Sequence, residues 1–455
     1  MPALGGFKQL ELGQLSDLAK QEYLSRQTEI GERWSYYKRK QKKWIIDSKS
    51  GKPTSENVII NVTKKIVDQT VSFLFGKTPK ISAGDQYATE IEELLDINRE
   101  SIFFTNLGKE GAISGHCFVK IVPNEAGGVQ WVTQSTQLVS AFWRPDNAGQ
   151  AIGYKIEWNA DKTDFRQDII FLPEQQKWLI RELKRGDRSE WIQAKEDVMW
   201  NFSFPPIIDW QNLPDNSNFY GESDITAIDL NDSINFTASN VNRILKYHAH
   251  PRTVGTGIKA EEIKETSVDG FWTTENENAQ ITNLEMISDL SSSMNYLHFL
   301  RGSFFSEQNA VDLDSVKDKL GDLTNFALKV LFNDAIAKNN TKQNLYEYGI
   351  KELVYRSLVV MGKQINARDV DVEFFDPLPI NAQEMAQTTQ LERESGFLSK
   401  QTAAEKNGID WKTEQKRIAA EKEAEDINLG QTLLDAINKF DNGQNGQKSQ
   451  GGSDA

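Results

Sequence analysis

The residues best suited to metal or thiol chemistry in this chain are Cys117, His248 and His250. They could be imagined as metal ligands, but two histidines two residues apart at a helix end make a poor site. The pair His116-Cys117 would suggest a reactive thiol, yet Cys117 begins an apolar strand and is therefore predicted to be a small core residue. We expect neither a metal site nor a reactive cysteine.

Motifs for nucleotide or hydrolytic chemistry are also missing from the sequence. Gly255-x-Gly257 lacks the third glycine and the preceding strand of a dinucleotide fingerprint, and a tight turn explains it without a ligand. The chain has no Walker-type loop, no Gly-x-Ser-x-Gly elbow, no His-Glu-x-x-His and no paired cysteines. Because no spaced pair of carboxylates stands out either, the sequence predicts a protein that is not an enzyme and needs no cofactor.

The stretch from Asp224 to Phe305 predicts a helix, an irregular tip and a returning helix. Ser223 or Asp224 is expected to cap the first helix, which ends at His250-Pro251, and the second helix is expected from Leu284. The tip between them is too short to hold a core of its own, since units below about 40 residues rarely fold alone. Its partners are predicted to be other copies of the same chain.

The flanking sequence predicts an α+β protein. Helices are expected over 10–46, 57–75 and 87–111, and from Cys117 to Trp200 the apolar period changes to two, which predicts an antiparallel meander. A polar segment at 306–324 precedes a long helix over 325–361, which Gly349 or Asn339-Asn340 would bend. A strand over 370–375 follows, then short helices capped by Asn381, Ser399 and Asp410, and a tail that is predicted to be disordered over 442–455.

Composition and charge exclude several classes of protein. No apolar run is long enough to span a bilayer, and the first residues show no signal pattern. We therefore expect a product that is made in the cytoplasm and does not associate with a membrane. The formal net charge of −14 argues against tight binding of nucleic acid. The basic run Lys38–Lys43 is read either as a solvated helix face or as a patch that contacts phosphate.

Several separated segments, taken in order, resemble the portal proteins of tailed double-stranded DNA phages, of the long-tailed siphophage type. The stretch Asn218–Asp224 is similar to the family's N-P-Y-G-x-S-D, with Phe219 in place of the proline. The family's Ser-Gly-x-Ala-Leu-Lys motif reads Thr324–Lys329 here, which is a departure. The other matching segments are Asn61–Asp68 with Phe73–Pro79, Gly115–Lys120, Asp376–Pro379, Glu394–Ser399 and Glu414–Ile418.

This resemblance implies a portal fold assembled as a ring of twelve copies (thirteen in some isolated assemblies) at one capsid vertex of the virion. Double-stranded DNA would be packaged and ejected through its channel. The partners implied are the terminase large subunit, the head-completion or adaptor proteins, and the major capsid and scaffolding proteins. The implied domains are a β-rich wing (1–223), a stem helix (224–250), a small α/β clip (251–283), a returning stem helix (284–305), a tunnel loop (306–324), a long helix and strand that return to the wing (325–380), a helical crown (381–426) and a C-terminal tail (427–455).

The resemblance also implies where the chain would meet its partners. The tunnel loop would bring Asp314, Lys317, Asp318 and Lys319 near DNA, although the two lysines could instead pair with those two acids. The clip would face terminase and the adaptors with Lys259, Glu261, Glu262, Lys264 and Glu265. The alternatives are another phage head or connector subunit and, less favoured, a phage nucleic-acid enzyme that uses unrecognised carboxylates.

Overall fold

The computed structural model describes twelve stretches of the chain. They divide into two compact units, Met1–Gly321 with Lys329–Leu378, and Asp322–Leu328 with Pro379–Ala455, each considered by itself. No helix among the described residues is both long and apolar enough to cross a bilayer. The described residues are 17–125, 127–144, 147–186, 190–216, 218–249, 252–257, 264–265, 272–273, 278–284, 290–316, 325–378 and 382–422.

The first helices of the first unit are shorter than the sequence predicts. α1 (Asp17–Tyr37) ends before the basic run, because the buried side chain of Gln41 donates to the Tyr36 carbonyl and accepts from Asn231, which fixes irregular backbone there. α2 (Val62–Phe75) begins only after Asn61, whose side chain accepts from the Lys64 amide. The helix expected over 87–111 is two, α3 (Ala88–Ile97) and α4 (Glu100–Ser114), which are separated at Arg99 by a positive φ of 48°.

The β structure forms two main antiparallel sheets rather than the single meander expected. β2 (His116–Pro123) lies between β3 (Val129–Gln134) and β10 (Ile207–Gln211). The larger sheet has the order β4-β5-β6-β7-β8, with β9 also paired to β7. Its strands are β4 (Val139–Arg144), β5 (Asn147–Ala160), β6 (Thr163–Leu172), β7 (Lys177–Arg185), β8 (Trp191–Gln193) and β9 (Val198–Trp200).

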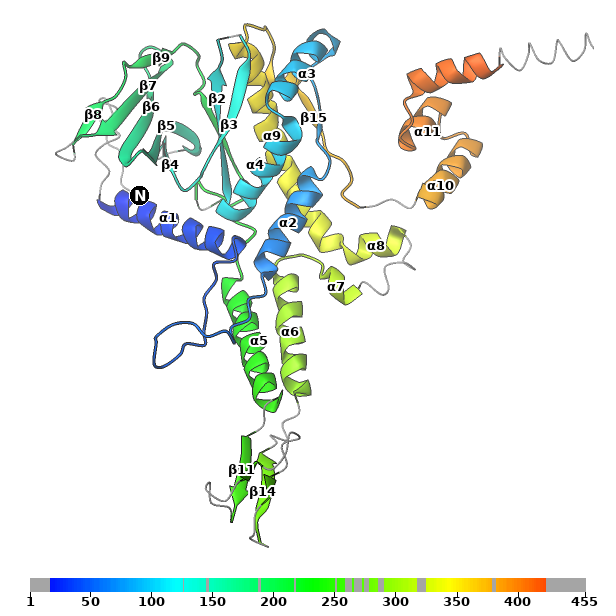
Figure 1. Cartoon of the computed structure of the whole chain (residues 1–455). Coiled ribbons are helices and arrows are strands. Elements are labelled where there is room, and N and C mark those ends of the chain that lie inside the picture. Colours follow the sequence, from blue (N-terminus) through cyan, green and yellow to red (C-terminus); the bar gives the residue numbers. More distant parts are fainter. Residues whose placement is uncertain are drawn as a thin grey trace, which may run out of the picture. The chain divides into compact units, whose positions relative to one another are not determined.

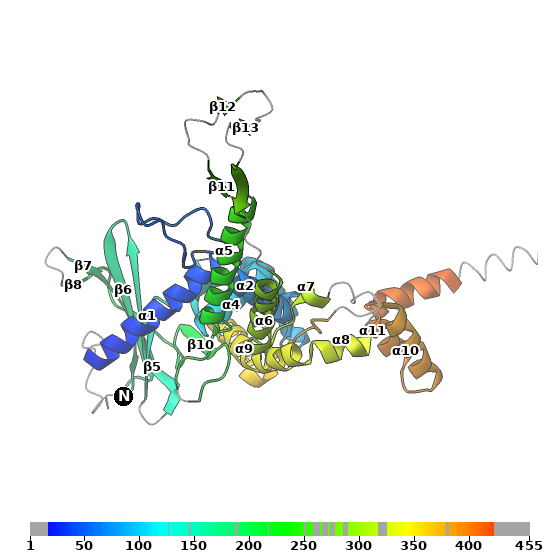
Figure 2. The same cartoon turned by 90° about the horizontal axis from the view of Figure 1, so that it is seen from below.

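Helices cover these sheets and enclose the main core. α1 lies across the larger sheet, where Arg26 donates to the Val139 carbonyl and Tyr23 to the Glu157 carboxylate (Figure 2). The core joins α2, α3 and α4 to both sheets and to α9 (Asn333–Val360). A small pair, β1 (Lys80–Ser82) with β15 (Asp371–Glu373), closes the unit near α9. The expected α+β class is confirmed.

The long helix expected over 325–361 is broken, but not at the predicted bends. α8 (Asn325–Leu331) and α9 are separated at Phe332, whose buried ring packs 5.8 Å from that of Phe73. α9 then runs unbroken through Asn339-Asn340 and Gly349. Gly349 has a packing role instead, since a Cβ there would lie 2.3 Å from the ring of Trp210.

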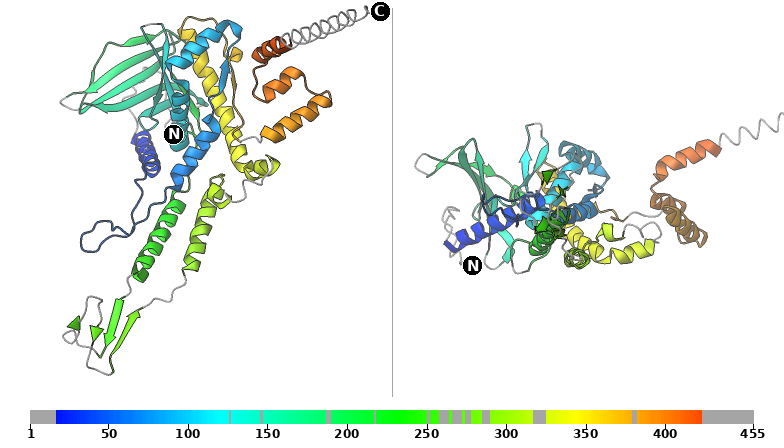
Figure 3. Two further views of the ribbon diagram at one scale, coloured as in Figure 1. Left: turned by 45° about the vertical axis from the view of Figure 1, so that its right-hand side comes forward. Right: turned by 60° about the horizontal axis from the view of Figure 1, so that its bottom comes forward.

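An antiparallel helix pair extends from α2 toward a short β-hairpin (Figures 1 and 3). α5 (Ile228–Ala249) begins four residues later than expected, and α6 (Ser291–Glu307) follows a strand that includes Leu284, the predicted start of the returning helix. Ile234, Leu300 and Phe304 form a core between the two helices and α2. Beyond the pair lie β11 (Arg252–Thr256) with β14 (Gln280–Leu284), and β12 (Lys264–Glu265) with β13 (Trp272–Thr273).

The second unit is helical where the structure describes it. α10 (Ala382–Glu394) precedes α11 (Lys400–Lys406), and a further helix spans 411–422. Ser399 caps α11 as predicted, by accepting from the Thr402 amide at 3.1 Å. Asp410 likewise accepts from the Lys412 amide. Asn381 and the tail expected to be disordered lie outside the described residues.

Candidate functional site: a buried ionic joint

The turn that leads into α5 is packed against the end of α4. Ser223 Oγ lies 2.8 Å from the carbonyl oxygens of Ala112 and Ile113, and the Asp224 amide donates to Ala112 O at 2.8 Å. Gly221 permits this approach, because a Cβ there would lie 2.8 Å from the carbonyl oxygen of Gly115, the residue after α4. The expected caps, Ser223 and Asp224, are therefore buried anchors rather than N-terminal residues of a helix.

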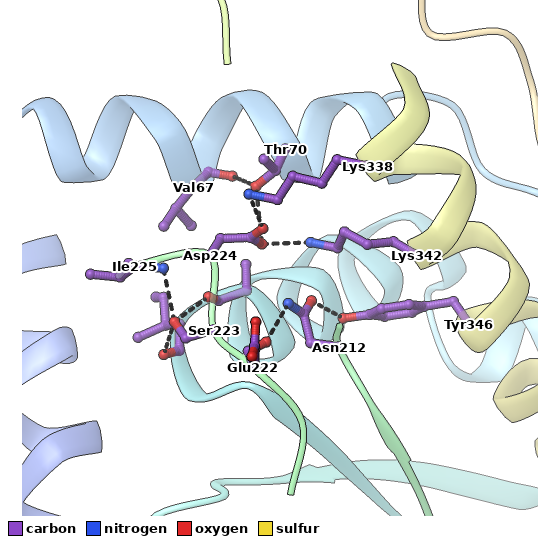
Figure 4. Close-up of polar contacts among 12 residues, drawn as sticks. Val67, Thr70, Asn212, Glu222, Ser223, Asp224, Ile225, Lys338, Lys342 and Tyr346 are labelled. Atoms are coloured by element: carbon purple, nitrogen blue, oxygen red, sulfur yellow. Dashed lines mark hydrogen bonds and ion pairs between the residues drawn. The ribbon is translucent and has the colours of Figure 1, made fainter. Parts of the chain in front are cut away.

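Asp224 carries a buried carboxylate that faces two ammonium groups of α9 (Figure 4). Lys342 Nζ lies 2.6 Å from Oδ2 and Lys338 Nζ lies 2.8 Å from Oδ1. Burial alone would raise the pKa of Asp224, but the charges of Lys342 and Lys338 outweigh it and lower the pKa to about 2. Asp224 is thus ionised at neutral pH, and its negative charge compensates buried positive charge.

Lys338 connects both helices of the pair to α9. Its ammonium also donates to the carbonyl oxygen of Gln308, the residue that follows α6, at 3.1 Å. The Thr70 hydroxyl of α2 also lies 3.4 Å from Asp224 Oδ2. One cluster of charges therefore joins the start of α5, the end of α6, α2 and α9, and we call Asp224, Lys338 and Lys342 the ionic joint.

A series of hydrogen bonds next to the ionic joint holds the turn before α5 in place (Figure 4). Tyr346 donates to Asn212 Oδ1 at 3.0 Å, and Asn212 Nδ2 donates to Glu222 O at 3.1 Å. Cys117 Sγ lies 3.4 Å from the Tyr346 oxygen, and burial raises the pKa of the Cys117 thiol to about 12. A thiol with so high a pKa is unreactive at neutral pH, which confirms Cys117 as a core residue.

The ionic joint holds α9, α2, the residue after α6 and the turn before α5 together. Its two ammonium groups and one carboxylate are largely enclosed, and Lys338 has the Gln308 carbonyl oxygen as a further acceptor. Within the described stretches, no group of three or more His, Cys, Asp or Glu residues could hold a metal ion. His248 lies in α5, whereas His250 is outside the described residues.

The structure describes three of the nine charged residues singled out in the sequence. Asp314 lies in α7 (Leu313–Val316), where its carboxylate faces Lys65 and Arg301. Lys264 and Glu265 form β12, opposite Thr273 and Trp272. Lys259, Glu261, Glu262, Lys317, Asp318 and Lys319 lie outside the described residues.

Sequence reasoning missed the ionic joint. Asp224 was read as a helix cap, and Lys338 and Lys342 were not singled out. The one local signal was their spacing, because lysines at i and i+4 precede the aromatic Tyr346 at i+8 and so share a helix face with a core residue. That spacing does not identify Asp224, which is 118 positions from Lys342, as the partner.

Comparison with known families places this chain in a class of structural virion protein, the phage portals. Residues 17–427 match the family described as phage portal protein, SPP1 Gp6-like, and the chain belongs to that family, which confirms the resemblance drawn from its motifs. The family is a structural component of phage particles, so the chain is a virion component.

Two solved structures similar to this chain are titled "Virion of native gene transfer agent (GTA) particle" and "Neck of native GTA particle computed with C12 symmetry". Their sequence identities are 13% and 12%, and each has a TM-score of 0.45. Each comparison covers 76% of this chain and 89% of the other. A search of curated proteins gave no match.

Proposed function

We propose that this protein forms a ring of twelve copies at one capsid vertex, through which double-stranded DNA is packaged and later ejected. The observation that carries the proposal is the match to the portal family over residues 17–427, which includes the helix pair and the ionic joint. The ring would dock the terminase large subunit during packaging and head-completion or adaptor proteins afterwards. It would also contact the major capsid and scaffolding proteins.

The surface of the helix pair supports assembly from copies of one chain. Phe236 of α5 and Tyr296 and Phe299 of α6 have exposed fractions of 48%, 53% and 65%. Large apolar side chains exposed on a slender pair of helices favour burial against a neighbour. Contacts between two different faces of identical copies close into a ring when the rotation permits.

The charge of the chain supports passage of DNA rather than its retention. A wall rich in cations would release counterions from the duplex and bind it tightly. With a net charge of −14 per copy, a twelve-membered ring would carry about −168 formal charges and would repel the phosphates over most of its surface. DNA would therefore slide under the force of the motor.

The domains follow as part of the same proposal. The wing is 1–223, the stem segments are 224–250 and 284–305, which hold α5 and most of α6, and the clip is 251–283. The tunnel loop is 306–324, and the segment 325–380 returns to the wing. The crown is 381–426, and the tail is 427–455. In this arrangement the ionic joint lies at the root of the stem and resists force that the motor applies to the clip.

Packaging with an altered clip tests the proposal. Reversal of the charges of Glu261, Glu262 and Glu265 to lysine should leave the ring intact and lower terminase-dependent packaging of DNA. The matched control reverses Glu92, Glu93 and Asp96, three acids of α3 outside the proposed clip. If the clip variant packages as much DNA as the control, the terminase-facing surface lies elsewhere.

A further inference from the structure

The first part of the proposed tunnel loop is fixed by four charges. Arg301 of α6 contacts Asp312 through Nε at 2.5 Å and Nη2 at 2.7 Å, and Nη2 also lies 2.5 Å from Asp314. Lys65 of α2 lies 2.7 Å from Asp314 Oδ2 and 3.7 Å from Asp312 Oδ1. The two positive charges, one on α2 and one on α6, thus equal the two negative charges at the start of α7 and just before it.

The core of the helix pair supports these ion pairs. The buried ring of Phe305 lies 5.7 Å from the Arg301 guanidinium and 5.8 Å from Lys65 Nζ. Ala310, just before the two acids, packs against the same core. Hydrogen bonds from Lys65 and Arg301 lower the pKa of Asp314 to about 2, so its charge is retained near neutral pH.

We propose that Lys65 and Arg301 are positioning residues that clamp the start of the tunnel loop to the wing helix α2 and the stem helix α6. Asp312 and Asp314 then serve as the loop's anchors, and Asp314 is not a contact for DNA. The clamp makes the position of the loop depend on α2 and α6 together, so a shift between stem and wing is passed to the DNA channel. The role in the channel rests on the proposed function, whereas the clamp itself does not.

A double-mutant cycle on the assembled full-length protein tests the clamp. Lys65→Met and Asp314→Asn each remove one charge of a partly exposed pair, so neither should unfold the chain. Hydrogen exchange of the peptide that covers residues 310–316 should become about two- to fivefold faster in each single variant. In the double variant the two effects should combine to less than their product, because the Lys65–Asp314 pair that they share is lost only once.

The control is the neighbouring pair Lys64 and Asp68, which lies within α2 and contacts neither acid of the loop. Lys64→Met and Asp68→Asn should leave exchange of residues 310–316 unchanged. Unaltered exchange in Lys65→Met and Asp314→Asn, or single effects that multiply in the double variant, would overturn the clamp.

Packaging by the same variants tests the role in the channel. Lys65→Met and Asp314→Asn should each lower packaged DNA, and the two losses should combine to less than their product in the double variant. A direct contact of Lys65 with phosphate would instead make Lys65→Met the more harmful change and Asp314→Asn neutral, which would contradict the positioning role. Failure of the unaltered protein to package would refute the proposed function while leaving the exchange result interpretable.

Discussion

The Asp224 carboxylate is the residue on which the ionic joint most depends, because both of its ammonium partners are largely buried. Removing one member of a buried ion pair leaves uncompensated charge and destabilises a protein by about 3–5 kcal/mol. We predict a loss of that size in the free energy of unfolding for Asp224→Asn, measured by urea denaturation. Asp68→Asn, at a partly exposed pair, should lower it by less than about 1 kcal/mol.

The same carboxylate predicts a pH dependence. Its pKa is lowered from 3.8 in the unfolded chain to about 2 in the folded protein, so its contribution to stability is complete only above about pH 5. That contribution is lost as pH falls toward 2, where the carboxylate becomes protonated. The difference in unfolding free energy between the wild type and Asp224→Asn should therefore shrink between pH 5 and pH 2.5. A difference that stays constant over this range would show that Asp224 does not act through its charge.

At the scale of elements, the exposed apolar face of α6 is expected to make contacts between copies. Phe299→Asp places a charge at a position with an exposed fraction of 65%, so the fold of the single chain should change little. The proportion of ring measured by sedimentation velocity should fall sharply, because the charge would have to be buried at the interface. Ile102→Asp, at a position on α4 with an exposed fraction of 59%, serves as the control and should assemble normally. If Phe299→Asp assembles as well as the wild type, the exposed face of α6 does not take part in contacts between copies.

Sequence patterns predicted elements well where periodicity extends over many residues, as in α5 and the strands β5 to β7. They failed where tertiary contacts decide a boundary. The helix is interrupted at Phe332, whose ring is buried beside Phe73, and Gln41, in the irregular backbone after α1, accepts a hydrogen bond from Asn231, 190 positions away. The sequence did not predict two separate sheets, because β2 pairs with β10, a strand that lies about ninety residues further along the chain.

The candidate site was less predictable than the fold for a related reason. Motifs indicated the family, but they did not show that Asp224 meets two lysines or that Asp314 is an anchor. An acid next to a helix start has a sufficient local explanation as a cap. Only its burial against α9 reveals the different role.

At the scale of the whole molecule, the central claim is that copies of this chain close around a channel. Native mass spectrometry of the purified full-length protein tests it most directly. We predict a particle of about 619 kDa, twelve copies of the 51.6 kDa chain, or about 671 kDa for thirteen, with a central hole in end-on electron-microscope averages. A single species of 51.6 kDa under conditions that favour assembly would contradict the account.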